Sequence, residues 1–287
     1  MFSKRIRTSL LSGLAAFLLL STVGASSATA TRPCAPATDF DSGDFSNPTV
    51  INNEWLPLVP GTQFILDGVA NRGGGLLPHR VVTTVTDLTK VIDGIPAVVV
   101  LDKDFNADVL VESELAFFAQ DDGGNVWSLG EYPEEYGNGI LLGAPNTWIS
   151  GLAGAEAGTI MRADPRLGTT WYGQGSAPEI AFLDCGKVYK TGQQISVPSY
   201  ENVLVTKETS PLEPGGLQLK YYASGVGNIA IGAVGDPEGE TLVLTGTERL
   251  ASGDFAQINT EALSQDCRGY QFGPDVYDVT PHIGLCT

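Results

Sequence analysis

The sequence is poor in basic residues and in histidine. Its 287 residues hold 16 Lys and Arg against 33 Asp and Glu, with only two His, so the formal net charge is −17. Such a charge repels nucleic-acid phosphates, and we expect no nucleic acid among the partners. A Ser-His-Asp triad would need His79 or His282. We interpret both as ordinary surface histidines.

Several catalytic signatures are also missing. The sequence has no Gly-x-Ser-x-Gly elbow, no His-Glu-x-x-His pair and no Walker phosphate loop. The letters GVGNIA at 225–230 match a dinucleotide-binding pattern. They lie between two expected strands with no helix after them, so we predict a turn there. The motifs therefore point to no nucleotide-dependent chemistry.

Cysteine is scarce but evenly numbered. The four residues are Cys34, Cys185, Cys267 and Cys286. A zinc site is the alternative, but the chain has no Cys-x-x-Cys and its two histidines are far apart. We therefore predict two disulfides, and of the three possible pairings we favour Cys34–Cys185 with Cys267–Cys286.

No hydrophobic run reaches the length of a membrane-spanning helix. The first thirty residues instead have the order of an export signal: Lys4, Arg5 and Arg7, an apolar stretch at 10–20, and Ala-Thr-Ala at 28–30. We expect cleavage after Ala30 and a secreted, extracellular protein with no membrane anchor. Removing these residues, which hold three bases and no acid, takes the net charge to −20.

Short β-branched segments separated by turn residues dominate the rest. Strands are expected at 62–67, 80–88, 95–101, three times within 98–132, and at 180–183, 203–208, 217–223, 228–233 and 241–250. This spacing predicts an all-β fold, a curved antiparallel sheet that is a half-barrel or barrel-like. We expect a signal peptide at 1–30, an N-terminal arm at 31–47, a β domain at 48–250 and a Cys-containing extension at 251–287. Only 254–263 looks helical. Residues 133–178, rich in Gly, Ala and Pro, are expected to form a long loop insertion.

An acidic segment suggests a calcium site. Asp102, Asp104, Asn106 and Asp108 occupy positions 1, 3, 5 and 7 of an expected turn. Oxygen ligands at this spacing can converge on calcium, although an EF-hand would need Gly and Glu where this chain has Ala107 and Ser113. The alternative is a solvated acidic turn.

Two further carboxylates support an enzyme hypothesis. Glu112 and Glu114 share one strand face, about 7 Å apart, opposite the apolar face formed by Leu115, Phe117 and Ala119. A glycosidase-like hydrolase could use such an acid pair. The sequence offers Trp148, Trp171 and Tyr172 as its stacking, ligand-binding surface. The alternative places both acids on the solvated outer face of the sheet.

Three motifs carry a resemblance. They are PLVPG at 57–61, AQDDGGNVWSLGEY at 119–132 and KYYASGVGNI at 220–229. Together they resemble a widespread group of secreted bacterial β-proteins that have no agreed activity. The last motif is also similar to the Tyr-x-x-Gly-Val-Gly turn of periplasmic half-barrel proteins. The resemblance implies a curved antiparallel sheet with an apolar cavity and brings no catalytic residues. The leading hypothesis is thus a non-catalytic binding or envelope-associated protein, and the alternative is an extracellular hydrolase.

Overall fold

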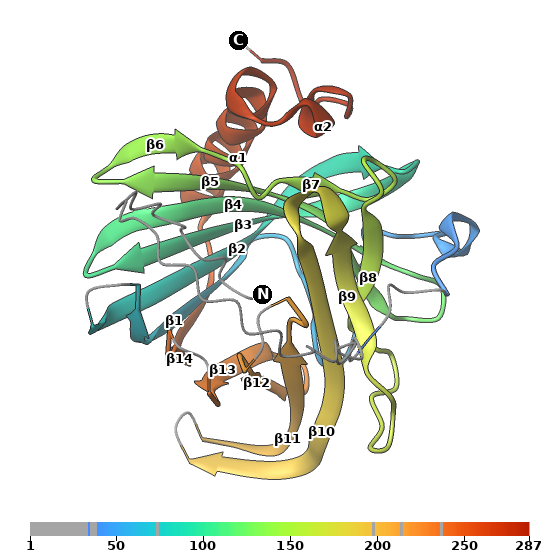
Figure 1. Cartoon of the computed structure of the whole chain (residues 1–287), viewed down its shortest axis with the longest axis vertical. Coiled ribbons are helices and arrows are strands. Elements are labelled where there is room, and N and C mark those ends of the chain that lie inside the picture. Colours follow the sequence, from blue (N-terminus) through green and yellow to red (C-terminus); the bar gives the residue numbers. More distant parts are fainter. Residues whose placement is uncertain are drawn as a thin grey trace, which may run out of the picture.

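The strands form one antiparallel sheet that closes on itself (Figure 1). The computed structural model describes residues 34, 39–72, 75–196, 199–212, 215–235 and 238–286. Within these ranges the sheet has fourteen strands, in the order β4-β3-β2-β1-β14-β13-β12-β11-β10-β9-β8-β5-β6, and β7 pairs with β5. A further pairing of β4 with β5 closes a barrel of 12 strands. The predicted all-β, barrel-like fold is confirmed.

The elements have the following bounds. The strands are β1 (Thr62–Asn71), β2 (Leu76–Ile92), β3 (Ile95–Asn106), β4 (Val109–Gln120), β5 (Val126–Gly137), β6 (Ile140–Gly143), β7 (Trp148–Ile149), β8 (Glu156–Met161), β9 (Tyr172–Ala177), β10 (Phe182–Ser196), β11 (Ser199–Thr209), β12 (Gln218–Ala223), β13 (Gly227–Ala233) and β14 (Thr241–Arg249). The helices are η1 (Ser42–Asp44), η2 (Pro178–Ile180), α1 (Ser252–Phe272) and α2 (Asp275–Asp278).

Tight turns connect the first strands of the barrel. Asp93 and Gly94 have φ angles of 51° and 78°, and Ala107 and Asp108 have 46° and 64°. Two central residues with positive φ match the right-handed twist of the strands that they join. Irregular register, as between Val85 and Thr89 on β2, marks bulges that bend the sheet. These features let long strands curl into a closed barrel.

The predicted loop insertion at 133–178 is wrong. This segment contains the end of β5 and all of β6, β7, β8 and β9. Strands β8 and β9 are buried on both faces, so they lack the alternation by which a half-exposed strand is recognised. Their small residues permit close packing, since a Cβ at Gly158 would lie 2.1 Å from the carbonyl carbon of Gln174.

Helix α1 packs on the outside of the barrel against β2 and β4, and α2 packs against β7 (Figure 1). The predicted apolar face of β4, with Leu115 and Phe117, packs in one core with Ala262 and Tyr277. The sequence indicated helix only for 254–263, whereas α1 has 21 residues. Its buried positions, Ala262, Gln265, Asp266 and Gly269, are polar or small, which hides the usual amphipathic pattern.

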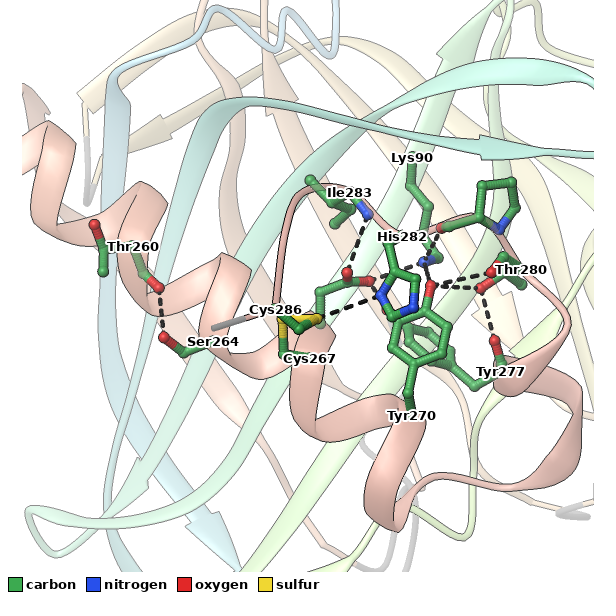
Figure 2. The surroundings of a disulfide bond; sticks show 12 residues. Lys90, Thr260, Ser264, Cys267, Tyr270, Tyr277, Thr280, His282, Ile283 and Cys286 are labelled. Carbon is green, nitrogen blue, oxygen red and sulfur yellow. Dashed lines mark hydrogen bonds and ion pairs between the residues drawn. A yellow bond between two sulfur atoms is a disulfide. The ribbon is translucent and has the colours of Figure 1, made fainter.

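Both favoured disulfide pairings are confirmed. Cys34 bonds Cys185 and Cys267 bonds Cys286, with Cα atoms 5.8 and 5.5 Å apart. Figure 2 shows the second disulfide beside Lys90, whose ammonium group points into the C-terminal segment. Lys90 Nζ donates to Asp266 Oδ1 at 2.8 Å, to Tyr270 Oη at 2.8 Å and to the Pro281 carbonyl at 2.9 Å. The C-terminal segment is therefore held by one covalent bond and one buried polar network.

Some predictions concern residues that are not described. The signal peptide at 1–30 and its cleavage site lie outside the described residues. In the part of the chain that the structure describes, none of the helices has both the length and the apolar character needed to cross a bilayer.

Candidate functional site

The interior of the barrel contains a cavity of about 200 Å³. Its apolar wall includes Phe64, Leu66, Val100, Phe118, Ile160, Phe182, Tyr222, Ile231 and Leu242. Eight carboxylates also line it: Asp102, Asp104, Glu112, Glu114, Glu131, Asp184, Glu208 and Glu240. Lys220 is the single basic residue among the described lining residues. The cavity is thus partly apolar and strongly acidic.

Four of these acids form two cross-strand pairs. Asp102 on β3 is opposite Glu114 on β4, and Asp104 is opposite Glu112. The placement of the two glutamates on a solvated outer face is therefore wrong. Strand β4 does have two distinct faces, but α1 covers the outer one, so the acidic face is the one that lines the barrel interior.

The segment 102–108 is not one turn. Asp102, Asp104 and Asn106 belong to β3, and only Ala107 and Asp108 form the connection to β4. Alternation on the strand directs the first two acids into the cavity. In the described residues, no three His, Cys, Asp or Glu side chains are grouped as metal ligands. Calcium stays a prediction.

Burial changes the proton affinity of the two aspartates. Removal from water raises the pKa of Asp102 to about 6, against the opposing effect of a hydrogen bond from Thr83. Burial likewise raises the pKa of Asp104 to about 7, although the positive charges of His79 and Arg72 oppose the shift. Both carboxyl groups thus take up protons far more readily than exposed aspartates do.

His79 is not a surface residue. It is 2% exposed, and its Nδ1 lies 2.8 Å from Asn106 Oδ1 while its Nε2 lies 3.2 Å from Glu240 Oε1. Burial alone would lower the pKa of His79, but the interactions with Glu240 and Asp104 outweigh it and raise the pKa. Arg72 joins the group through an ion pair with Glu240 at 3.3 Å. A charged, buried network therefore borders the cavity at Asp104 and Glu240.

Lys220 has a partner of its own. Its Nζ lies 2.7 Å from Glu208 Oε2, and both side chains are buried. Burial raises the pKa of Glu208, while hydrogen bonds from Gln174 and Thr206 oppose this shift. Lys220 is thus engaged by Glu208, and the neighbouring cations His79 and Arg72 interact with Glu240 and Asp104. The lining itself keeps an excess of acidic over basic residues.

The three predicted stacking residues do not form an exposed surface. Trp148 is 2% exposed and packs against Phe182, with ring centroids 5.4 Å apart. Tyr172 is buried under the Arg162 guanidinium, 4.5 Å from its ring centroid. Trp171 packs against the Cys34–Cys185 disulfide. The aromatic residues that face the cavity are instead Phe64, Phe118, Phe182 and Tyr222.

Sequence reasoning missed Glu131, Asp184, Glu208, Lys220 and Glu240. One signal was available on β12, where Gln218, Lys220 and Tyr222 alternate with Leu219 and Tyr221. Alternation indicates two faces on this strand, and in an open sheet the polar face would be the solvated one. In a closed barrel the polar face can also line the interior.

The fold and the cavity define a class: an antiparallel β-barrel with a helical outer cover and an acidic, partly apolar interior. No protein-family model matches the sequence, and no curated protein does. Two solved structures are similar. One is a protein of Bacteroides fragilis, inferred to be exported and having a YmcC-like fold, with 13% identity, a TM-score of 0.35, and coverage of 68% of this chain and 99% of that one. The other, from Parabacteroides distasonis, is inferred to be a lipoprotein, with 13% identity, a TM-score of 0.30, and coverage of 67% and 97%.

Proposed function

We propose that the protein is an exported, non-catalytic binding protein whose barrel holds a small ligand with an apolar body and a cationic group. The observation that carries this proposal is the composition of the cavity wall, where eight carboxylates and one lysine accompany a broad apolar surface. A dry cavity of about 150 Å³ is enough for benzene. A cavity of about 200 Å³ therefore suits an arylalkyl amine of roughly ten non-hydrogen atoms.

Each part of the wall has a distinct role in such binding. Phe118 and Phe182 offer apolar surface to the body of the ligand, at about 25 cal/mol for each Å² removed from water. The ammonium group would lie against the Asp102–Glu114 pair, where it relieves repulsion between neighbouring acids. A cation binds the ionised form of Asp102, so affinity should rise as pH increases through about 6.

The first prediction compares three probes of nearly equal shape. We expect 2-phenylethylamine to bind at least about tenfold more tightly than 2-phenylethanol, and phenylacetate to bind least, because only the amine pairs with the acids. Calorimetry at pH 7.5 measures this order. Asp102→Asn should weaken amine binding about tenfold and leave alcohol binding unchanged.

Asp87→Asn is the matched control, because Asp87 is an exposed acid on β2 outside the cavity lining. It removes the same charge and should leave amine affinity unchanged. Equal affinities for amine and alcohol would contradict cation selection, and equal losses in both variants would show only a general effect of net charge.

Calcium is a second candidate occupant, and it carries its own prediction. Asp102 and Asp104 line the cavity from the same face of β3, so a divalent cation would relieve their mutual repulsion. We expect calcium to raise the melting temperature, with a gain of up to about 2.7 kcal/mol at one hundred times the dissociation constant. Sodium at equal ionic strength should do much less. A calcium effect that is the same in Asp102→Asn/Asp104→Asn would contradict this site.

The hydrolase remains the alternative function, because Glu112 and Glu114 do line a cavity. Glycoside hydrolysis would require one of them to act as acid and the other as base or nucleophile. The sharp test is a screen of extracellular polysaccharides with the native protein and with Glu114→Gln. Turnover that the variant abolishes would replace the binding proposal with an enzymatic one.

A further inference from the structure

The basic residues are distributed in a way that points to a second site. Most of those in the described ranges are engaged in ion pairs or in hydrogen bonds to carbonyl groups: Arg72, Arg80, Lys90, Lys103, Arg166, Lys220, Arg249 and Arg268. Arg162 lies over the ring of Tyr172. Three lysines remain, and none of the ion pairs or hydrogen bonds of the described residues involves their ammonium groups. All three lie on the hairpin of β10 and β11: Lys187, Lys190 and Lys207.

Two of these lysines lie over one aromatic ring, and the third lies across the hairpin from one of them. Lys187 on β10 is directly opposite Lys207 on β11. Lys207 Nζ lies 3.8 Å from the ring centroid of Tyr189, and Lys190 Nζ lies 5.1 Å from it. Tyr189 is 38% exposed, lies two residues after Lys187 on β10, and is at a register irregularity between Val188 and Lys190. We name Lys187, Tyr189, Lys190 and Lys207 the lysine patch.

The lysine patch carries a cost in the isolated protein. Like charges directly opposite each other on neighbouring strands destabilise a sheet. The contact of Lys207 with the Tyr189 ring offsets part of that cost. The chain has 33 acidic residues, yet none of the ion pairs of the described residues involves these lysines. Their ammonium groups can therefore contact an external anion.

We propose that the lysine patch binds an acidic polysaccharide. The lysines supply charge for carboxylate groups, and the exposed part of the Tyr189 ring supplies an apolar surface for the C–H face of a sugar. A bilayer of anionic lipids is a poorer fit, because a broad surface would also meet the acids that give the chain its net charge of −17. A thin linear polymer can contact the hairpin alone. This inference does not depend on the occupant of the cavity.

The experiment measures binding of a polygalacturonate oligomer at low salt by calorimetry, with dextran as the neutral polymer. We expect polygalacturonate to bind and dextran not to bind, and added salt to weaken binding. Lys187→Gln/Lys207→Gln should reduce affinity at least tenfold. The matched control is Arg80→Gln/Lys103→Gln, which also removes two positive charges, but ones that are already ion-paired. It should retain the native affinity, and circular dichroism should show both variants folded.

Two further binding measurements distinguish an acidic polysaccharide from other anionic partners. Tyr189→Ala should weaken binding of polygalacturonate but not of polyacrylate, which carries carboxylates without sugar rings. Vesicles of phosphatidylglycerol should bind less than the glycan does. Failure to bind polygalacturonate, equal losses in the two double variants, or stronger binding to vesicles would each overturn the proposal, whatever ligand the cavity takes.

Discussion

Replacing Lys90 with methionine is expected to lower the free energy of unfolding by about 3–5 kcal/mol. Lys90 and Asp266 are both wholly buried and lie 176 residues apart in the chain, on β2 and α1. Met fills a similar volume but leaves the Asp266 carboxylate without its cation in a water-free site. The hydrogen bonds from Tyr277 and from the Ile283 backbone amide remain, yet they do not neutralise the charge. Urea unfolding followed by circular dichroism measures the loss.

Two variants separate burial of a lone charge from loss of contacts. Lys90→Met/Asp266→Leu removes both charges, and we expect it to be more stable than Lys90→Met alone, because it leaves no uncompensated ion. Lys103→Met breaks the ion pair with Glu261, whose side chain is 43% exposed, and should cost less than about 1 kcal/mol. A loss as small as this in Lys90→Met would contradict the role of the network in fixing the C-terminal segment (Figure 2).

This network also shows what the sequence could not reveal. Lys90 lies between Thr89 and Val91 near the end of β2, and Asp266 lies in a helix of weak amphipathicity. Nothing local indicates that the two side chains meet. The disulfide pairing was predictable, because Cys267 and Cys286 close a short local loop and leave Cys34 for Cys185. The partner of a buried charge instead depends on where distant elements pack.

For the candidate site, too, the sequence was enough to predict one part and not enough to predict the other. Alternation correctly separated Leu115 and Phe117 from Glu112 and Glu114, since side chains on a strand point to opposite faces. It could not tell which face would be outside, because that depends on closure of the barrel and on α1. His79 was misplaced for a related reason. It is buried where β2 and β3 meet the residue just before β14, beside Asn106 and Glu240.

The protein is expected to lose stability as pH rises from 5 to 7.5. In the unfolded chain an aspartate releases its proton near its ordinary pKa of 3.8, whereas in the folded protein Asp102 keeps it to about 6. A proton held more tightly in the folded state stabilises that state, and this contribution disappears as pH rises through the folded pKa. For Asp102 alone, its full size is about 3 kcal/mol.

The neighbouring groups act in the same direction. Asp104 has a pKa of about 7, the pKa of Glu208 is raised by burial, and the raised pKa of His79 also gives stability that is lost as pH increases. Glu240 has a lowered pKa, so its contribution changes only in more acidic solution, below this range. Burial therefore opposes ionisation of these acids, and an amine or a divalent cation, which binds their ionised forms, should bind more tightly near neutral pH.

The dependence of stability on pH is measured by urea unfolding at pH 5 and at pH 7.5. The proteins compared are the native protein, Asp102→Asn and Asp87→Asn. Asparagine cannot ionise, so Asp102→Asn should be more stable than the native protein at pH 7.5, by up to about 3 kcal/mol. At pH 5 the gain should fall to roughly half of that, because the contribution of Asp102 is lost between its unfolded pKa of 3.8 and its folded pKa of about 6. Asp87→Asn should follow the native pH dependence, because it changes an exposed acid. Native stability that increases between pH 5 and 7.5 would contradict ionisation of a buried acid cluster. A pH dependence that persists unchanged in Asp102→Asn would assign the effect to Asp104, Glu208 and His79 instead.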